Sequence, residues 1–263
     1  LELERVAMHL AGLSGLAADI GFLQGATTYG RLRTTAINTT MRLCGSRFGR
    51  GALRPGGVRL RLTPELLEEV KKNVELLRTD VAIINEHFLS DATVRHRLAR
   101  VGVLSQAQAR ALGVVGLTAR ASGVLLDARY QAPMGPWATA PIAPVVLLEG
   151  DCKARAKLRV AEMNASLTWL SEAFANGPRL GAPRKTVGPL SPQSLAVSVV
   201  EGWRGEVVHC LETAERGELM HYKVQDPSLR NWMGLAIAVR HNEISDFPIC
   251  NKSFDLSYCG NDL

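Results

Sequence analysis

The longest helical pattern in the chain follows a Thr-Pro-Glu sequence, and it constrains the fold more than any other feature. Apolar residues recur after it at three- and four-residue steps, at Leu67, Val70, Val74, Leu77, Val81, Ile84 and Phe88. This spacing places them on one face of a helix of about six turns. Thr63 is a suitable N-cap, Pro64 fits the first turn and Glu65 favours the positive end of the dipole. A helix with one apolar stripe packs against others, so the pattern predicts a helical bundle.

Two further stripes of this kind flank it. The first contains Leu3, Val6, Leu10, Leu13, Ala17 and Ile20, and the second Ala156, Val160, Met163, Leu167, Leu170 and Phe174. Gly21 and Gly25 are expected to end the first helix. Asp151 is expected to cap the second and Gly177 to end it. Glu4 and His9 are predicted to form a polar rim beside the first stripe.

The only clear strand signals lie near the C-terminus. Three segments alternate apolar and polar residues, around Val197 to Val199, Val207 to Leu211 and Leu219 to Lys223. The sequence Glu215-Arg-Gly217 is a turn signal between the last two. A small antiparallel sheet is therefore predicted, with His209 and His221 facing each other across a hairpin. Asp226-Pro-Ser228 is then expected to cap the last helix, from Leu229 to about Arg240.

Charge and composition exclude several classes of protein. The 263 residues carry a formal net charge of +6. Such an excess suits nucleic-acid binding when it clusters beside aromatic residues. Here it is mostly Arg spread through predicted helices, and aromatic residues are only 5% of the chain. The charge therefore favours a basic face against an acidic partner subunit over nucleic acid.

Hydropathy and cysteine spacing indicate the relation of the chain to the membrane and its redox compartment. No stretch approaches the ~18 consecutive apolar residues that a membrane-spanning helix needs, so no transmembrane segment is expected. The cysteines number five, with no Cys-x-x-Cys pair, at Cys44, Cys152, Cys210, Cys250 and Cys259. An odd count without paired spacing argues against a disulfide framework and fits a reducing cytosol.

The C-terminal part carries the most specific motifs. It contains Glu201-Gly-Trp-Arg204-Gly, then Ser-Asp246-Phe-Pro, and then Ser-Phe-Asp255-Leu. These motifs resemble the end of the large subunit of nickel-iron hydrogenases and of its counterpart in respiratory complex I. The resemblance is nearest to the membrane-bound, formate-hydrogenlyase-type enzymes. It implies that Arg204 lies over a metal centre and that Asp246 orders the loop carrying the C-terminal tail, which makes both candidate catalytic residues.

Three internal segments extend this resemblance over essentially the whole chain. They are Gly45 to Val58, Gly116 to Arg129 and Gly150 to Met163. The first resembles the complex I segment that faces the iron-sulfur cluster of the small partner subunit. The resemblance implies that Arg47, Arg50 and Arg54 face that partner cluster. In the second segment, Arg120, Asp127 and Arg129 are predicted to form a buried network that holds a loop.

The metal motif departs from the family pattern. Hydrogenases carry Asp-Pro-Cys-x-x-Cys here, but an ungapped match places Ser257 and Gly260 at the two thiolate positions. Serine is a poor ligand for soft nickel, and glycine has no side chain. The nearest sulfurs, Cys250 and Cys259, are nine residues apart and would need ligands from elsewhere. We therefore expect this chain to bind no metal and no other cofactor.

These features together predict a mainly α protein: a long-helix bundle with a small antiparallel β-sheet near the C-terminus. We expect a single large-subunit-like domain over residues 1–263 that lacks an upstream segment, where complex I keeps quinone contacts. The resemblance implies an oxidoreductase subunit involved in electron transfer, cytoplasmic and peripheral on the inner face of the membrane. Its expected partners are a small iron-sulfur subunit and other subunits of a membrane redox complex. Two alternatives stay open: an active nickel-iron hydrogenase with rearranged ligands, and a non-catalytic basic binding module.

Overall fold

The chain groups into two compact units in a computed structural model that describes residues 1–60, 62–176 and 185–259. Unit 1 comprises residues 1–94 and 160–187, and unit 2 comprises residues 95–159 and 188–263. One long helix, α9 (Cys152–Ala175), contributes its first turns to unit 2 and the remainder to unit 1. The single domain expected over residues 1–263 stays a prediction.

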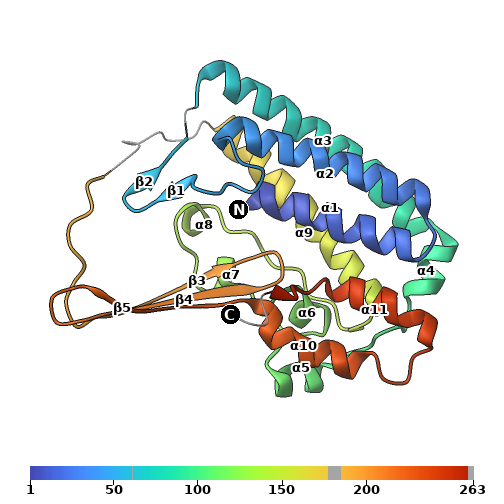
Figure 1. The fold of residues 1–263 in the computed structure, drawn as a ribbon. Helices are drawn as coiled ribbons and strands as arrows, with labels where there is room; N and C mark the ends of the chain where they lie inside the picture. The colour runs from blue at the N-terminus through green and yellow to red at the C-terminus, as the bar shows by residue number, and fades with distance from the viewer. Residues whose placement is uncertain (61, 177–184, 260–263) are drawn as a thin grey trace. The chain divides into compact units, whose positions relative to one another are not determined.

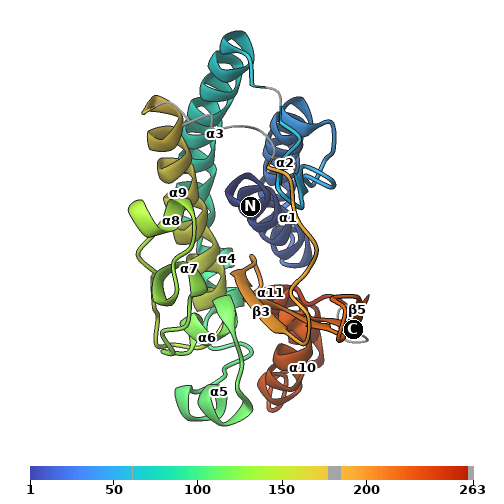
Figure 2. The same cartoon turned by 90° about the vertical axis from the view of Figure 1, so that its left-hand side faces the viewer.

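Unit 1 is a bundle of long helices (Figures 1 and 2). Its helices are α1 (Glu2–Asp19), α2 (Leu23–Cys44), α3 (Pro64–Ser90) and the second part of α9. A two-stranded hairpin, β1 (Leu53–Arg54) and β2 (Gly57–Val58), follows α2. Helix α2 packs against both α1 and α3. The apolar stripes predicted for α1 and α3 line this core, with Leu10, Val74 and Val81 fully buried.

The start of α3 is as predicted. Thr63 Oγ1 accepts a hydrogen bond from the backbone N–H of Leu66 at 3.2 Å, and Pro64 occupies the first turn. Helix α2, in contrast, was not predicted, and Gly25 lies inside it rather than ending α1. Its six threonines are β-branched and disfavour helix. In the fold, five of them donate their hydroxyls to backbone carbonyls three or four residues earlier in α2.

Unit 2 combines shorter helices with the only sizeable sheet among the described residues. Its helices are α5 (Gln106–Leu112), α6 (Gly116–Ala121), α7 (Ala128–Gln131), α8 (Pro136–Thr139), α10 (Pro227–Ala238), the 3-10 helix η1 (Ile244–Asp246) and α11 (Phe247–Phe254). A further helix, α4 (Ala92–Leu98), spans the point in the chain where unit 1 gives way to unit 2. The predicted caps are present, since Asp151 Oδ1 accepts from Ala154 N–H and Asp226 Oδ1 from Ser228 N–H, both at 2.7 Å.

The predicted sheet is confirmed. Strands β3 (Leu195–Glu201), β4 (Glu206–Thr213) and β5 (Leu219–Gln225) are antiparallel in the order β3-β4-β5. The expected pairing of His209 with His221 is wrong. The register places His209 opposite Val224, and its Nδ1 lies 2.6 Å from the Tyr222 hydroxyl. Position Gly177, the predicted end of α9, lies outside the described residues.

The predicted fold class, mainly α with a small C-terminal sheet, is confirmed. The prediction that α10 is the last helix is wrong, because η1 and α11 follow it. Pro248 is the second residue of α11, in the first turn, where its missing N–H costs no helical hydrogen bond. Among the described residues, no helix has the length and apolar character needed to cross a bilayer.

Candidate functional site

Arg204 lies in the tight turn that joins β3 to β4. The turn is closed by two backbone hydrogen bonds between Gly202 and Gly205, of 2.8 and 3.3 Å. It packs directly on the start of α6, because a Cβ on Gly116 would lie 2.2 Å from the Arg204 carbonyl oxygen. Gly116 has a φ of +63°, which also favours glycine. The start of helix α6 therefore fixes the position of the Arg204 backbone.

The Arg204 guanidinium reaches the C-terminal segment. Its Nε donates a hydrogen bond to the backbone carbonyl of Asp255, and the group stacks 3.8 Å from the Trp203 ring centroid. Burial lowers the pKa of Arg204, while the carboxylates of Asp255 and Asp226 oppose that shift. Even so, arginine stays charged, because its ordinary pKa is above 12. The structure thus holds a cation against the segment where the resembling hydrogenases have their metal motif.

The segment after Asp255 is anchored through its backbone. The N–H of Ser257 donates to Ser228 Oγ at 2.9 Å, and its carbonyl accepts from Trp232 Nε1 at 3.3 Å. The Tyr258 ring packs 5.2 Å from the Trp232 ring. Ser257 occupies one of the two positions that match thiolate ligands in hydrogenases, and these contacts hold it in place. Gly260, which occupies the other position, lies outside the described residues.

The two candidate sulfurs near this segment have different environments. Cys250 is fully buried in α11, whereas Cys259 is exposed. Among the described residues, no group of three or more His, Cys, Asp or Glu side chains could hold a metal ion. The metal roles of both cysteines stay predictions.

Asp246 lies at the entry to α11 and contacts Glu243 and Arg97. Its Oδ2 accepts from the backbone N–H of Glu243 at 3.3 Å, and its Oδ1 lies 3.8 Å from Arg97 Nη2. These contacts hold the turn that precedes the C-terminal segment. They give Asp246 a positioning role in this structure, and a catalytic role for it or for Arg204 stays a prediction.

The predicted buried network is present and is larger than expected. It consists of Arg120, Asp127, Arg129 and Glu201, called here the Arg120 network, and all four side chains are at most 2% exposed. Arg120 Nη1 lies 2.9 Å from Glu201 Oε1 and 3.4 Å from Asp127 Oδ2. Arg129 grips Asp127 through two nitrogens, at 3.1 and 2.8 Å. The network ties the loop before α7 to the end of β3, three residues from Arg204.

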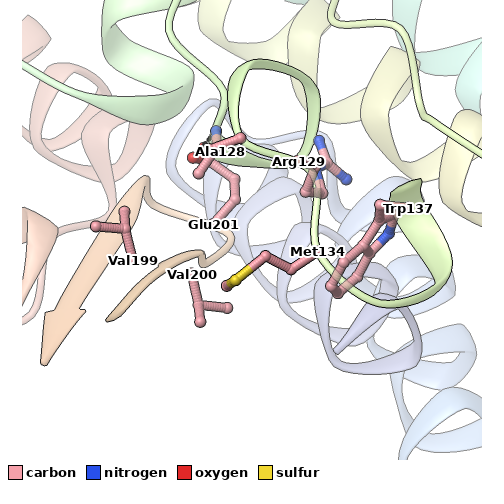
Figure 3. A pocket seen from close by; sticks show the side chains of 8 residues that line it. Ala128, Arg129, Met134, Trp137, Val199, Val200 and Glu201 are labelled. Atoms are coloured by element: carbon pink, nitrogen blue, oxygen red, sulfur yellow. Dashed lines mark hydrogen bonds between the residues drawn. The ribbon is translucent and has the colours of Figure 1, made fainter. Parts of the chain in front are cut away.

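A small pocket lies beside this network (Figure 3). Its walls are mostly apolar, formed by Ala128, Ala132, Met134, Trp137, Val199 and Val200. Figure 3 shows Met134 between Trp137 and Val200. The polar lining comes from Arg129 and Glu201, which already belong to the network. The pocket thus offers few additional polar groups for recognising a ligand.

The arginines assigned to the partner-facing segment are all on the surface of unit 1. Arg47, Arg50 and Arg54 are exposed, and so is Phe48 at 42%. The Arg47 guanidinium lies 5.8 Å from the Phe48 ring centroid. Among the described residues, none of the three arginines forms an ion pair. The structure therefore leaves their charges available to a partner, although it does not test the contact.

Sequence reasoning missed a buried polar cluster inside unit 1. It consists of Glu2, Arg5, His9, Glu162 and Ser166, called here the His9 cluster. The polar-rim prediction for His9 is wrong, since its side chain is fully buried and its Nε2 lies 3.0 Å from Glu162 Oε2. Glu2 Oε2 accepts from Arg5 Nε at 3.2 Å and from Ser166 Oγ at 2.6 Å. The three- and four-residue spacing of its members on α1 was the available signal.

Comparison with known proteins gives a consistent result. The family model described as "Respiratory-chain NADH dehydrogenase, 49 Kd subunit" matches residues 19–187. The C/D subunit of the NADH-quinone oxidoreductase of Bacteroides thetaiotaomicron is 32% identical over 226 residues, covering 85% of this chain and 42% of that protein. Formate hydrogenlyase subunit 5 of Escherichia coli is 28% identical over 260 residues, covering 98% and 45%.

A solved structure agrees with the fold. A chain of an archaeal respiratory membrane complex, the membrane-bound sulfane sulfur reductase, superposes with a TM-score of 0.93 at 23% identity. The match covers 100% of this chain and 73% of that one. The chain spans less than half the length of the two relatives named above. The resemblance deduced from the sequence motifs is confirmed.

Proposed function

Because the chain belongs to the family of the 49 kDa subunit of respiratory-chain NADH dehydrogenase, we propose that it is a large-subunit-like component of a membrane-associated redox complex. In this proposal it docks on an iron-sulfur small subunit at the inner face of the membrane. It contributes structure and a fixed positive charge, and holds no nickel-iron centre of its own.

One observation carries this proposal. Arg204 is held against the C-terminal segment by a hydrogen bond to the Asp255 carbonyl and by stacking on Trp203. This contact supports the proposal because the resemblance implies that Arg204 lies at the family's reactive position, and the family match favours a redox complex as its setting. A half-buried cation in such a place favours a nearby negative charge.

The residues present do not fit a nickel-iron centre. Two thiolate donors would have to come from the positions of Ser257 and Gly260, which have no sulfur. The Ser257 hydroxyl is a hard oxygen donor, whereas nickel and low-valent iron sites favour soft thiolates. Cys259 is exposed and Cys250 is buried in α11, and neither stands at a motif position. No reaction step is therefore assigned to a metal on this chain.

Docking is assigned to the segment from Gly45 to Val58. It carries three exposed arginines and an exposed Phe48. Arginine next to an aromatic ring is the combination enriched in protein interfaces, and arginine pairs well with carboxylates. An acidic, cluster-bearing subunit is the partner that this surface would fit.

The metal part of the proposal is tested by elemental analysis. The full-length protein, purified without oxygen after growth with nickel, is expected to contain far less than one nickel per chain. Formate hydrogenlyase subunit 5, purified in parallel, serves as the comparison. Stoichiometric nickel in the full-length protein would instead support the alternative, a hydrogenase with rearranged ligands.

The docking part is tested by reversing charge at the interface. The variant R47E/R50E/R54E is expected to weaken co-purification of the iron-sulfur subunit by at least about tenfold, since unpaired like charges across an interface cost several kcal/mol. The control R110E/R216E/R240E makes the same change of net charge at exposed arginines of unit 2 and should retain the partner. Equal loss in both variants would show that net charge alone matters. No loss in either would place the interface elsewhere.

A further inference from the structure

A pair of buried cysteines lies apart from the Arg204 segment and has no role in the proposed function. Cys152 is the first residue of α9, and Cys250 lies within α11. Both are fully buried, and neither forms a disulfide. Their sulfurs approach each other closely: a Cβ added to Gly102 would lie 2.5 Å from Cys250 Sγ and 3.2 Å from Cys152 Sγ. Glycine at 102 is what leaves room for both.

An arginine completes the site. Arg155 Nη2 donates to the sulfur of Cys152 at 3.4 Å and to the Gly102 carbonyl at 2.8 Å. Its Nε donates to Ser253 Oγ at 2.9 Å, and its guanidinium stacks 4.2 Å from the Phe254 ring centroid. These contacts fix the guanidinium beside the two sulfurs. A fixed positive charge in contact with the pair disfavours a metal cation there and favours a thiolate.

The two sulfurs are electrostatically different. A hydrogen bond with Cys250, helped by Arg155, lowers the pKa of Cys152 to about 6, against the opposing effect of burial. The positive end of α9 acts in the same direction. The same hydrogen bond, together with burial, raises the pKa of Cys250. This is the arrangement of a nucleophilic thiolate next to a thiol that can resolve its oxidised form.

We propose that Cys152 and Cys250 are a peroxide-reactive thiol pair that closes reversibly to a disulfide between α9 and α11. The Cys152 thiolate attacks one oxygen of hydrogen peroxide and breaks the O–O bond, giving a sulfenic acid and, after uptake of a proton, water. The sulfur of Cys250 then attacks the sulfenic sulfur. An S–S bond forms, and hydroxide leaves and takes the Cys250 proton as a second water. Two electrons pass from the thiol pair to the peroxide.

The burial of both sulfurs limits the rate of this reaction. Peroxide is small, but it reaches the pair only when the loop at Gly102 or helix α11 opens locally. The reaction is therefore slower than oxidation of the exposed Cys259. The disulfide would join α9, which carries Arg155, to α11, which immediately precedes the C-terminal segment. Oxidation by peroxide would therefore restrict the motion of α11 relative to the start of α9.

The test uses the full-length protein with the other three cysteines of this chain replaced, C44S/C210S/C259S. After treatment of the folded protein with hydrogen peroxide, denatured samples are labelled with a maleimide and weighed by mass spectrometry. The proposal predicts that Cys152 and Cys250 no longer react with the maleimide and that the protein mass falls by two hydrogen atoms. Dithiothreitol should restore both thiols and the original mass. Retention of both thiols, or gain of oxygen at Cys152 with Cys250 still reduced, would overturn it.

Two single changes in that background assign the roles. With C250S, a dimedone probe is expected to trap a sulfenic acid on Cys152, whereas with C152S it should label nothing. Labelling of Cys250 in the C152S variant would reverse the assignment. The unsubstituted protein supplies the same answer without any mutation, as a disulfide-linked pair of peptides containing Cys152 and Cys250. None of these readouts depends on nickel or on a partner, so they are independent of the proposed function.

Discussion

The Arg120 network of unit 2 and the His9 cluster of unit 1 differ in the groups that carry their charges. The Arg120 network sets two arginines against two carboxylates, so its formal charges cancel. The His9 cluster sets two carboxylates against a single arginine, and its remaining basic group is an imidazole that is charged only when protonated. The first cluster is held by two guanidinium groups, while the second uses one guanidinium, an imidazole and the hydroxyl of Ser166.

This difference teaches what each cluster is suited to do. A balanced network with short hydrogen bonds fixes geometry, here the loop next to β3 and the Arg204 turn. The His9 cluster joins α1 to α9 with fewer guanidinium contacts, so losing one of its contacts should cost less. Three substitutions, from the largest expected effect to the smallest, would break or sharpen this contrast.

The variant R120M should have the largest effect. It removes the cation that lies between Glu201 and Asp127 and leaves both carboxylates short of a buried partner. Breaking a buried pair from one side costs about 3–5 kcal/mol, so the free energy of unfolding in urea should fall by about that amount. The matched control R110M changes an exposed arginine of α5 and should stay within about 0.5 kcal/mol. A loss below about 1 kcal/mol for R120M would mean that the network contributes little to stability.

The variant E162Q should have an intermediate effect. Gln keeps the shape and the hydrogen-bonding capacity of Glu162, and Arg5 keeps its contact with Glu2. The expected loss of unfolding free energy is about 1–3 kcal/mol, the range for weakening one buried polar contact. The control E172Q changes an exposed carboxylate on the same helix α9. If E162Q cost as much as R120M, the contrast between the clusters would fail.

The variant S171A should have the smallest effect, because its partner Glu75 is half exposed. The hydrogen bond from Ser171 lowers the pKa of Glu75. Its contribution is therefore present above the ordinary glutamate pKa and is lost as pH falls through the lowered value. After discounting for solvent screening, the loss in S171A is at most about 0.5 kcal/mol. Unfolding curves should show a larger difference at neutral pH than at about pH 3, because the contribution declines as the pH falls.

Much of the fold could be read from local sequence. The start of α3 and the caps of α9 and α10 rest on Thr63, Asp151 and Asp226, each acting on neighbours within three residues. Helix α2 was missed because its threonines disfavour helix intrinsically, and tertiary packing on α1 and α3 overrides that preference. Local rules fail where distant residues decide the outcome.

The candidate sites show the same limit. The motif predicted that Arg204 lies near the C-terminal segment, but not that its partner there is a backbone carbonyl. The burial of His9 depends on Glu162, 153 positions away along the chain. The thiol pair likewise joins residues whose spacing, from Cys152 to Cys250, matches no motif. Such contacts follow from topology, which periodicity does not encode.

The attachment of Arg204 to a peptide oxygen has one consequence for how the protein can change. Every amino acid supplies a main-chain oxygen, so the hydrogen bond at position 255 does not require a particular side chain, while the φ of +56° there favours Gly, Asn or Asp. The tail can thus lose or acquire donors at neighbouring positions without releasing the arginine. The metal-ligand positions of such a protein can therefore be substituted while the fold is kept.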